Sequence, residues 1–169
     1  MPLALSLPTN YQYVLLSMMV LPLECFFFGL IYINGLRGKM YTKEYMQQYE
    51  DESQKAFGRP AAKGGYPDSG NGKHSTKWNI QEWAKFNSGY RGHMNFVDYL
   101  PAMVVMTLLS GLYWPITNAC LGFAHCVFRF LYLMGYVIKP QLRQIGFLPM
   151  VLTLLTQIIL FWIGWGKLW

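Results

Sequence analysis

The chain has 169 residues, of which 53% are hydrophobic and 17% aromatic, while only 13% carry a charge. Nine of the 14 Lys/Arg and six of the 8 Asp/Glu lie between Arg37 and Lys85, so the flanking sequence is almost continuously apolar. This distribution excludes an ordinary soluble domain and predicts an all-α integral membrane protein. Despite a net charge of +6, we expect no nucleic-acid partner, because no basic stripe with interleaved aromatic residues occurs outside the membrane-flanking loops.

Four segments reach the length of about 20 mainly apolar residues that a transmembrane helix needs. They run at about 11–36, 86–114, 116–138 and 146–165. Pro22 predicts a kink in the first span, and Pro115 and Pro140 mark connections between spans. The sequence therefore predicts a four-helix membrane bundle, formed by a single domain over residues 1–169, with a long polar loop at about 44–82 between spans one and two.

The loop divides by composition. Residues 43–57, KEYMQQYEDESQKAF, predict a polar helix that continues span one or lies at the membrane interface. The stretch GRPAAKGGYPDSGNGKHST, rich in Gly, Pro and Ser, is expected to be mobile, and WNIQEWAKF is expected to form an amphipathic lead-in to span two. Lys and Arg concentrate in this loop and in the link between spans three and four, which places both on the cytosolic or matrix side. The first apolar run is too long for a cleaved signal, so we expect a retained first span.

Polar side chains inside these spans are costly, and they generally face a bundle interior or mark a site. At about 100° per residue, four of them share one sector of span two, with Tyr99 at its border and His93 pointing elsewhere: Asn87, Arg91, Asn95 and Asp98. Span three presents one polar face: His125, Arg129, Tyr132 and Tyr136.

Two interpretations of these residues remain open. Arg91, Asp98 and Arg129 would neutralise one another in a purely structural core, or the arginines would form a pocket for a small, anionic, peptide-like ligand. In the second case Asp98 would meet the ligand's ammonium group. Glu24, in the middle of span one, is expected to pair with Arg129 or with polar groups of span two. His125 is expected to be a hydrogen-bonded interior histidine, and Cys25, Cys120 and Cys126 to be buried and inert, with no metal site.

The stretch FNSGYRGHMNFVDYLP, residues 86–101, together with RFLYLMGY, residues 129–136, and KPQLR, residues 139–143, resembles the MAPEG family (membrane-associated proteins in eicosanoid and glutathione metabolism). The similarity is greatest to the type-3 microsomal glutathione transferases and the cysteinyl-leukotriene synthase branch, which NYQYVLL and LRGKMYTKEY also resemble. It extends over all four spans but not over the loop from about Glu50 to Ile80.

This resemblance implies a homotrimer that binds glutathione, as a co-substrate, between neighbouring subunits. The residues that would bind it are Arg37, Arg91, His93, Asn95, Asp98, Tyr99, Arg129, Tyr132 and Tyr136. Arg143 matches the family arginine that stabilises the thiolate, a role that agrees with the effect of a guanidinium on a thiol of pKa near 8.5. Asp98 departs from the usual Glu of the family, and Arg37-Gly38-Lys39 replaces a run of adjacent basic residues.

Three functions follow as hypotheses. The first is a glutathione transferase or peroxidase that acts on lipophilic electrophiles or lipid hydroperoxides. The alternative is a non-catalytic accessory subunit with unrelated membrane subunits as partners, for example in a mitochondrial respiratory complex. A lipid-binding scaffold is a third. The resemblance suggests the endoplasmic reticulum for this multi-pass protein, and the accessory hypothesis suggests a mitochondrial membrane.

Overall fold

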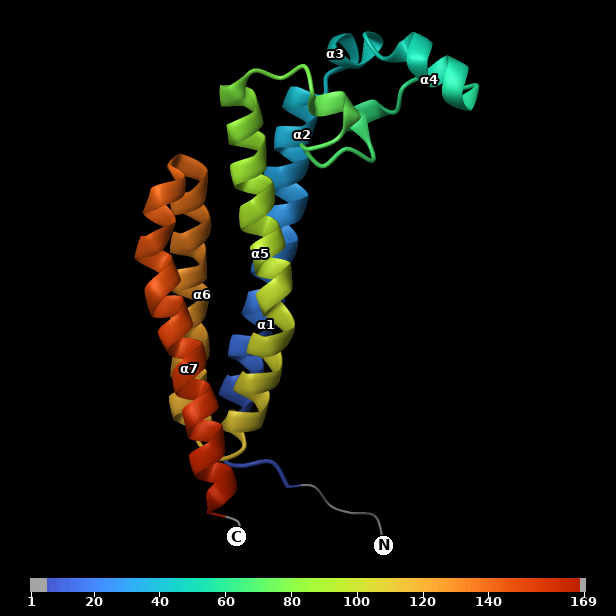
Figure 1. Ribbon diagram of the computed structural model, residues 1–169. Helices are drawn as coiled ribbons and strands as arrows, with labels where there is room; N and C mark the ends of the chain where they lie inside the picture. The colour runs from blue at the N-terminus through green and yellow to red at the C-terminus, as the bar shows by residue number, and fades with distance from the viewer. Residues whose placement is uncertain (1–5, 168–169) are drawn as a thin grey trace, which may run out of the picture. The chain divides into compact units, whose positions relative to one another are not determined.

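The computed structural model describes residues 6–167, and over that range the chain is helical without any strand. Its α-helices are α1 (Tyr11–Phe27), α2 (Asn34–Met40), α3 (Lys43–Gln47), α4 (Glu50–Phe57), α5 (Ile80–Gly111), α6 (Pro115–Ile138) and α7 (Gln144–Gly166) (Figure 1). A π-helical segment, η1 (Phe28–Ile33), joins α1 to α2, and the 3-10 helices are η2 (Lys63–Gly65), η3 (Lys73–Ser75) and η4 (Pro140–Arg143).

Four helical stretches are long and apolar enough to cross a membrane: Tyr11–Met40, Ile80–Gly111, Pro115–Ile138 and Pro140–Gly166. They confirm the predicted all-α bundle with four spans. Span one continues to Met40 instead of ending near residue 36, and α5 begins at Ile80, so the predicted amphipathic lead-in is the first part of the span-two helix. Large apolar side chains such as Met19, Ile31 and Ile159 are exposed along these helices, as a lipid-facing surface requires.

Span one changes from α-helix to π-helix after Phe27. Helix α1 continues through Pro22, and the π-helical segment Phe28–Ile33 follows it. There the Phe28 ring stacks on the His93 ring with centroids 6.2 Å apart, and a Cβ added to Gly29 would lie 2.7 Å from the His93 ring. Gly29 is therefore a position of close helix approach, which a larger residue would prevent.

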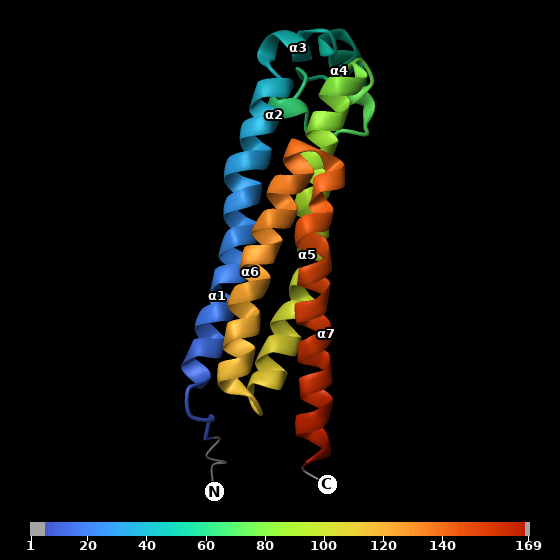
Figure 2. The ribbon, with the colours of Figure 1, turned by 90° about the vertical axis from the view of Figure 1, so that its left-hand side faces the viewer.

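The described residues form two compact units. Residues 6–26 and 95–167 make up the first, which we call the bundle unit, and residues 27–94 make up the second, the cap unit. In the bundle unit α6 and α7 lie against each other where η4 joins them, in both views (Figures 1 and 2). Gly146 permits this contact, because a Cβ there would lie 2.3 Å from the Tyr132 amide nitrogen and 2.4 Å from the Phe128 carbonyl oxygen.

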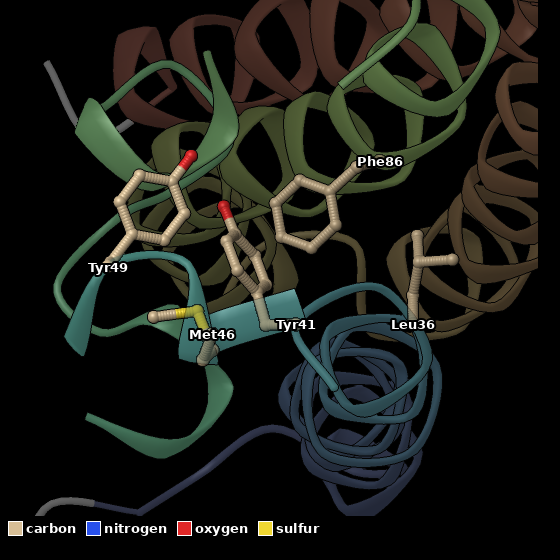
Figure 3. Packing of buried hydrophobic residues seen from close by; sticks show 5 residues of the cluster. All are labelled: Leu36, Tyr41, Met46, Tyr49 and Phe86. Carbon is tan, nitrogen blue, oxygen red and sulfur yellow. The ribbon is translucent and has the colours of Figure 1, made fainter. Parts of the chain in front are cut away.

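The cap unit has a core of five buried side chains, Leu36, Tyr41, Met46, Tyr49 and Phe86 (Figure 3). The segment predicted as one polar helix over 43–57 is instead two short helices, α3 and α4, separated at Gln48 and Tyr49. The break turns Tyr49 inward to the core, where it is 3% exposed, while α4 itself buries no side chain. The segment therefore forms two helices that bury Tyr49 and Met46, instead of one continuous helix exposed to solvent.

Asp68 organises the Gly-rich stretch that composition predicted to be mobile. Its Oδ1 accepts the backbone N–H groups of Gly70 and Gly72 at 2.7 and 2.9 Å, and its Oδ2 accepts that of Ser75 at 2.8 Å. The Tyr45 and Tyr49 hydroxyls both donate to the His74 carbonyl, at 2.6 and 3.0 Å. These hydrogen bonds give the stretch a defined conformation, in which one carboxylate and two tyrosines satisfy several of its backbone groups.

Loss of the Asp68 carboxylate is expected to loosen this stretch. Burial alone would raise the pKa of Asp68, but the N–H groups of Gly72, Gly70 and Ser75 hold it below its ordinary value. The stabilisation is therefore present above the unfolded-state pKa of about 3.9 and is lost as the pH falls through the lower folded-state value. Asp68→Asn, which directs an amide N–H at the Ser75 N–H, should cost about 1–3 kcal/mol at neutral pH.

Hydrogen exchange at the Ser75 amide, followed from pH 7 downward, measures this effect. Faster exchange in Asp68→Asn at neutral pH, with unchanged exchange in the exposed control Asp51→Asn, is the expected result. Equal protection in all three proteins would show that the carboxylate does not hold the loop.

Candidate functional site

A cavity of about 190 Å³ lies within the bundle unit, where α5, α6, η4 and α7 meet. Eight side chains line it: Asn95 and Tyr99 of α5, Arg129 and Tyr132 of α6, Arg143 of η4, and Gln144, Phe147 and Met150 of α7. Five of these are residues that the resemblance assigned to glutathione binding or thiolate stabilisation, namely Asn95, Tyr99, Arg129, Tyr132 and Arg143. The fold therefore brings together residues from three spans that are up to 48 positions apart in the sequence.

Arg129 forms the deep wall of the cavity. It is 1% exposed, and its guanidinium carbon lies 4.3 Å from the Phe96 ring centroid and 4.7 Å from that of Tyr132. Its Nη1 donates to the Met150 sulfur at 3.4 Å, which is a weak acceptor. Aromatic faces and a thioether attract a cation, and Glu24 interacts with the same guanidinium electrostatically.

Arg143 lies at the start of α7 and is half-buried. Its Nη1 donates to the Tyr136 hydroxyl at 3.0 Å, with the guanidinium 5.0 Å from that ring. Tyr136 packs edge-on to Tyr132, and the Tyr132 hydroxyl accepts a hydrogen bond from the Asn95 amide at 2.7 Å. A chain of contacts thus links Arg143 through two tyrosines to Asn95, and Tyr136 supports the site from behind Arg143.

The residues that line the cavity carry a net positive charge. Its eight lining residues include two arginines and no carboxylate. Asp98 is exposed on α5 and does not line the cavity; at 100° per residue it lies about 60° from Asn95, on the side opposite Tyr99. A guanidinium pair held within apolar spans attracts carboxylate or thiolate groups far more strongly than the same pair would in water.

Glu24 interacts electrostatically with Arg129, one of the partners expected for it. Both of its carboxylate oxygens are buried without a hydrogen-bond partner among the described residues, and its interaction with Arg129 is electrostatic, without a salt-bridge contact. Glu24 and Arg129 therefore interact through their charges within the bundle unit, as the structural interpretation expects, while Arg129 also lines the cavity.

His125 lies one turn before Arg129 and is a hydrogen-bonded interior histidine, as predicted. Its Nδ1 is 2.7 Å from the Thr153 hydroxyl, and that hydroxyl donates to the Met150 carbonyl at 2.7 Å. Since the single hydroxyl proton is committed to Met150, the His125 Nδ1–H must be the donor to Thr153. His125 thus joins α6 to α7 below the cavity.

Three of the predicted site residues belong to the cap unit. Arg37 is buried there, donates to the Gly64 carbonyl at 2.8 Å and stacks over the Tyr66 ring at 4.3 Å. His93 packs against Phe28 and Gly29, and Arg91 is exposed on α5. Arg37 therefore holds the loop onto the end of span one, which its position in the sequence gave no reason to expect.

Sequence reasoning missed three of the lining residues, Gln144, Phe147 and Met150. Phe147 and Met150 follow Arg143 at i+4 and i+7, so a helical projection from Arg143 would have placed both on its face. The prediction of three buried thiols is wrong for Cys120, which is exposed, whereas Cys25 and Cys126 are buried. Residues 6–167 contain no cluster of three His, Cys, Asp or Glu side chains arranged to hold a metal.

Comparison with known proteins supplies an independent line of support. A family model described as the MAPEG family matches residues 54–164. The matched range begins within α4, so it leaves out span one and includes much of the loop, in contrast to the extent of the resemblance noted from the motifs. It contains every residue that lines the cavity. No curated protein matches the chain.

Proposed function

This multi-pass membrane chain belongs to the MAPEG family, and from that premise we propose that it is a glutathione-dependent transferase or peroxidase for lipophilic electrophiles or lipid hydroperoxides. Within the family, we assign it to the type-3 microsomal glutathione transferase branch on the motifs of spans two and three. The observation that carries the proposal is the pairing of Arg129 and Arg143 in one cavity without a lining carboxylate.

Glutathione fits the chemistry of this lining. It carries two carboxylates, one ammonium group and a thiol, and a buried guanidinium binds a carboxylate through two parallel hydrogen bonds. Arg129 is the proposed carboxylate partner because it is the deeper of the two arginines. The Asn95 amide and the hydroxyls of Tyr99 and Tyr132 supply further hydrogen-bonding groups along the wall.

Arg143 is the proposed catalytic residue. A thiol of pKa near 8.5 is mostly protonated at neutral pH, and a guanidinium within hydrogen-bond reach favours its anion by about 1.4 kcal/mol per unit of pKa depression. In the transferase reaction the thiolate sulfur bonds to an electrophilic carbon, and the leaving group departs or water supplies the balancing proton. In the peroxidase reaction the thiolate sulfur attacks the terminal peroxide oxygen, the O–O bond breaks, and the departing alkoxide takes a proton from water to give an alcohol. A second glutathione then converts the sulfenic acid to a disulfide and water.

The cavity volume supports a site that is completed from outside this chain. About 190 Å³ is below the roughly 300–1,000 Å³ of typical ligand pockets, so a tripeptide must extend beyond it. Tyr99 and Phe147, 39% and 38% exposed, line its open side. This arrangement agrees with the proposed homotrimer, in which a neighbouring copy covers the opening and the exposed Asp98 meets the glutathione ammonium group.

Direct binding of glutathione to the purified protein in nanodiscs tests the proposal. Asn95→Ala removes a wall of the cavity and the Tyr132 hydrogen bond, and it should weaken binding roughly tenfold. Asn34→Ala, which alters an exposed amide of α2 outside the cavity, should bind as the wild type does. Absence of binding at millimolar glutathione would overturn the proposal.

The accessory-subunit function remains a second candidate because of the cap unit. Its folded loop presents apolar side chains at its surface, including Phe57, Tyr66 and Ile80 at 70%, 55% and 73% exposure, which a neighbouring subunit would cover. Copy number distinguishes the two functions. A closed ring of identical chains supports the enzyme, and a single copy among unrelated chains supports the accessory role.

A further inference from the structure

The cap unit contains a second and larger cavity, of about 550 Å³, at the end of the first span. One of its lining residues, Gly38, belongs to the last turn of that span, which ends at Met40. The others come from the chain that follows: Tyr41 and Thr42, then residues of α3, the start of α4 and the segment 60–64. A cavity that begins where a transmembrane helix ends lies at the depth of the lipid headgroups.

The walls of this cavity are largely apolar. Tyr41 and Met46, which are core residues of the cap unit, line it together with Pro60 and Ala61. The volume falls within the roughly 300–1,000 Å³ of ordinary ligand sites, so it admits a molecule with a substantial apolar part.

Two basic side chains also line this cavity. Lys43 and Lys63 both line it, and neither forms a salt bridge among the described residues. The single lining acid, Glu50, accepts the Ala61 backbone N–H at 3.3 Å, and Arg37 donates to the carbonyl of Gly64, another lining residue. The site thus combines apolar walls with a net positive charge at headgroup depth.

From this combination we infer that the cavity binds the headgroup of an anionic glycerophospholipid. The phosphate lies between the ammonium groups of Lys43 and Lys63, and the glycerol and first acyl carbons lie against Met46 and Pro60. A soluble anion would use the lysines but not the apolar walls, whereas a bilayer lipid uses both. The bound lipid would tie the loop to the membrane surface, independently of any chemistry at the bundle-unit cavity.

Native mass spectrometry tests this assignment with protein extracted from bilayers of phosphatidylcholine and phosphatidylglycerol. The wild type should retain phosphatidylglycerol in preference to phosphatidylcholine. Lys43→Gln/Lys63→Gln should lower that preference roughly tenfold or more, since each basic residue near a membrane surface contributes roughly a fivefold effect. The control Lys55→Gln/Lys85→Gln removes the same charge from exposed positions of the cap unit outside the cavity and should retain the lipid.

A steric pair of variants tests the same site without altering charge. A Cβ at Gly38 or at Gly35 meets no atom within 4 Å, so α2 tolerates a side chain at either position. Gly38→Phe places a ring at the cavity, whereas Gly35→Phe places one on the same helix outside it. Lipid retention should fall in Gly38→Phe and persist in Gly35→Phe.

Two results would overturn the inference. One is equal retention of phosphatidylglycerol by the wild type, the double lysine variant and Gly38→Phe. The other is displacement of the lipid by millimolar inorganic phosphate, which would assign the cavity to a soluble anion. Loss of lipid in Lys43→Gln/Lys63→Gln and in Gly38→Phe but not in their control variants, with no displacement by phosphate, supports the inference.

Discussion

Arg143→Ala is expected to lower kcat/KM for glutathione conjugation by about 10²–10³, because it removes the charge that stabilises the thiolate. Glutathione affinity should change only a few-fold, since Arg129, Asn95 and Tyr132 remain in the cavity. Steady-state rates with a generic lipophilic electrophile, measured across a range of pH, give this value. The variant should recover part of its rate at high pH, where glutathione ionises without help.

Matched variants separate thiolate stabilisation from a general disturbance of the site. Gln141→Ala changes an exposed neighbour in η4 that does not line the cavity, and it should leave the rate unchanged. Tyr136→Phe removes the hydroxyl that accepts from Arg143 at 3.0 Å and should have a smaller effect than the loss of Arg143 itself. An Arg143→Ala rate equal to that of the wild type would remove Arg143 from the mechanism.

Gly146→Ala is expected to have the largest effect on stability. The added Cβ would lie 2.3 Å from the Tyr132 amide nitrogen and 2.4 Å from the Phe128 carbonyl oxygen, and these backbone atoms cannot rotate away. Helices α6 and α7 must separate, at a cost of about 3 kcal/mol or more, which is the upper end for overpacking. Because Tyr132 lies on α6 and Arg143 directly precedes α7, the variant should also disturb the cavity geometry and lose glutathione binding.

The midpoint of thermal unfolding in detergent measures this cost. Gly166→Ala is the matched control, because a Cβ at that end of α7 meets no atom within 4 Å. A fall in the midpoint for Gly146→Ala alone is the expected result. An unchanged midpoint would mean that the two helices do not pack at Gly146 as described.

The spans were predictable because the bilayer imposes a length and a composition on each of them. Arg129, Asn95 and Tyr132 were predictable for a related reason, since a polar residue within an apolar span is costly and faces inward. Which of Asp98 and Tyr99 lines the cavity was not predictable, because both lie within about 60° of Asn95. The rotation of the helix that selects Tyr99 depends on its tertiary packing.

The cap unit could not be predicted from local pattern. Glycine, proline and serine in residues 58–76 indicate only that the backbone is permissive. What orders the stretch is a set of contacts across distance in sequence, such as the Tyr45 hydroxyl with the His74 carbonyl and Arg37 with the Gly64 carbonyl. Such pairings depend on the tertiary arrangement, which composition does not encode.

The central claim is that this protein holds glutathione as a thiolate beside Arg143. Ultraviolet difference spectra of glutathione bound to the protein in nanodiscs, recorded as a function of pH, test it most directly. The account predicts thiolate absorbance at a pH well below the ordinary thiol pKa of about 8.5, and loss of that shift in Arg143→Ala. Bound glutathione that ionises at its ordinary pKa in the wild-type protein would contradict it.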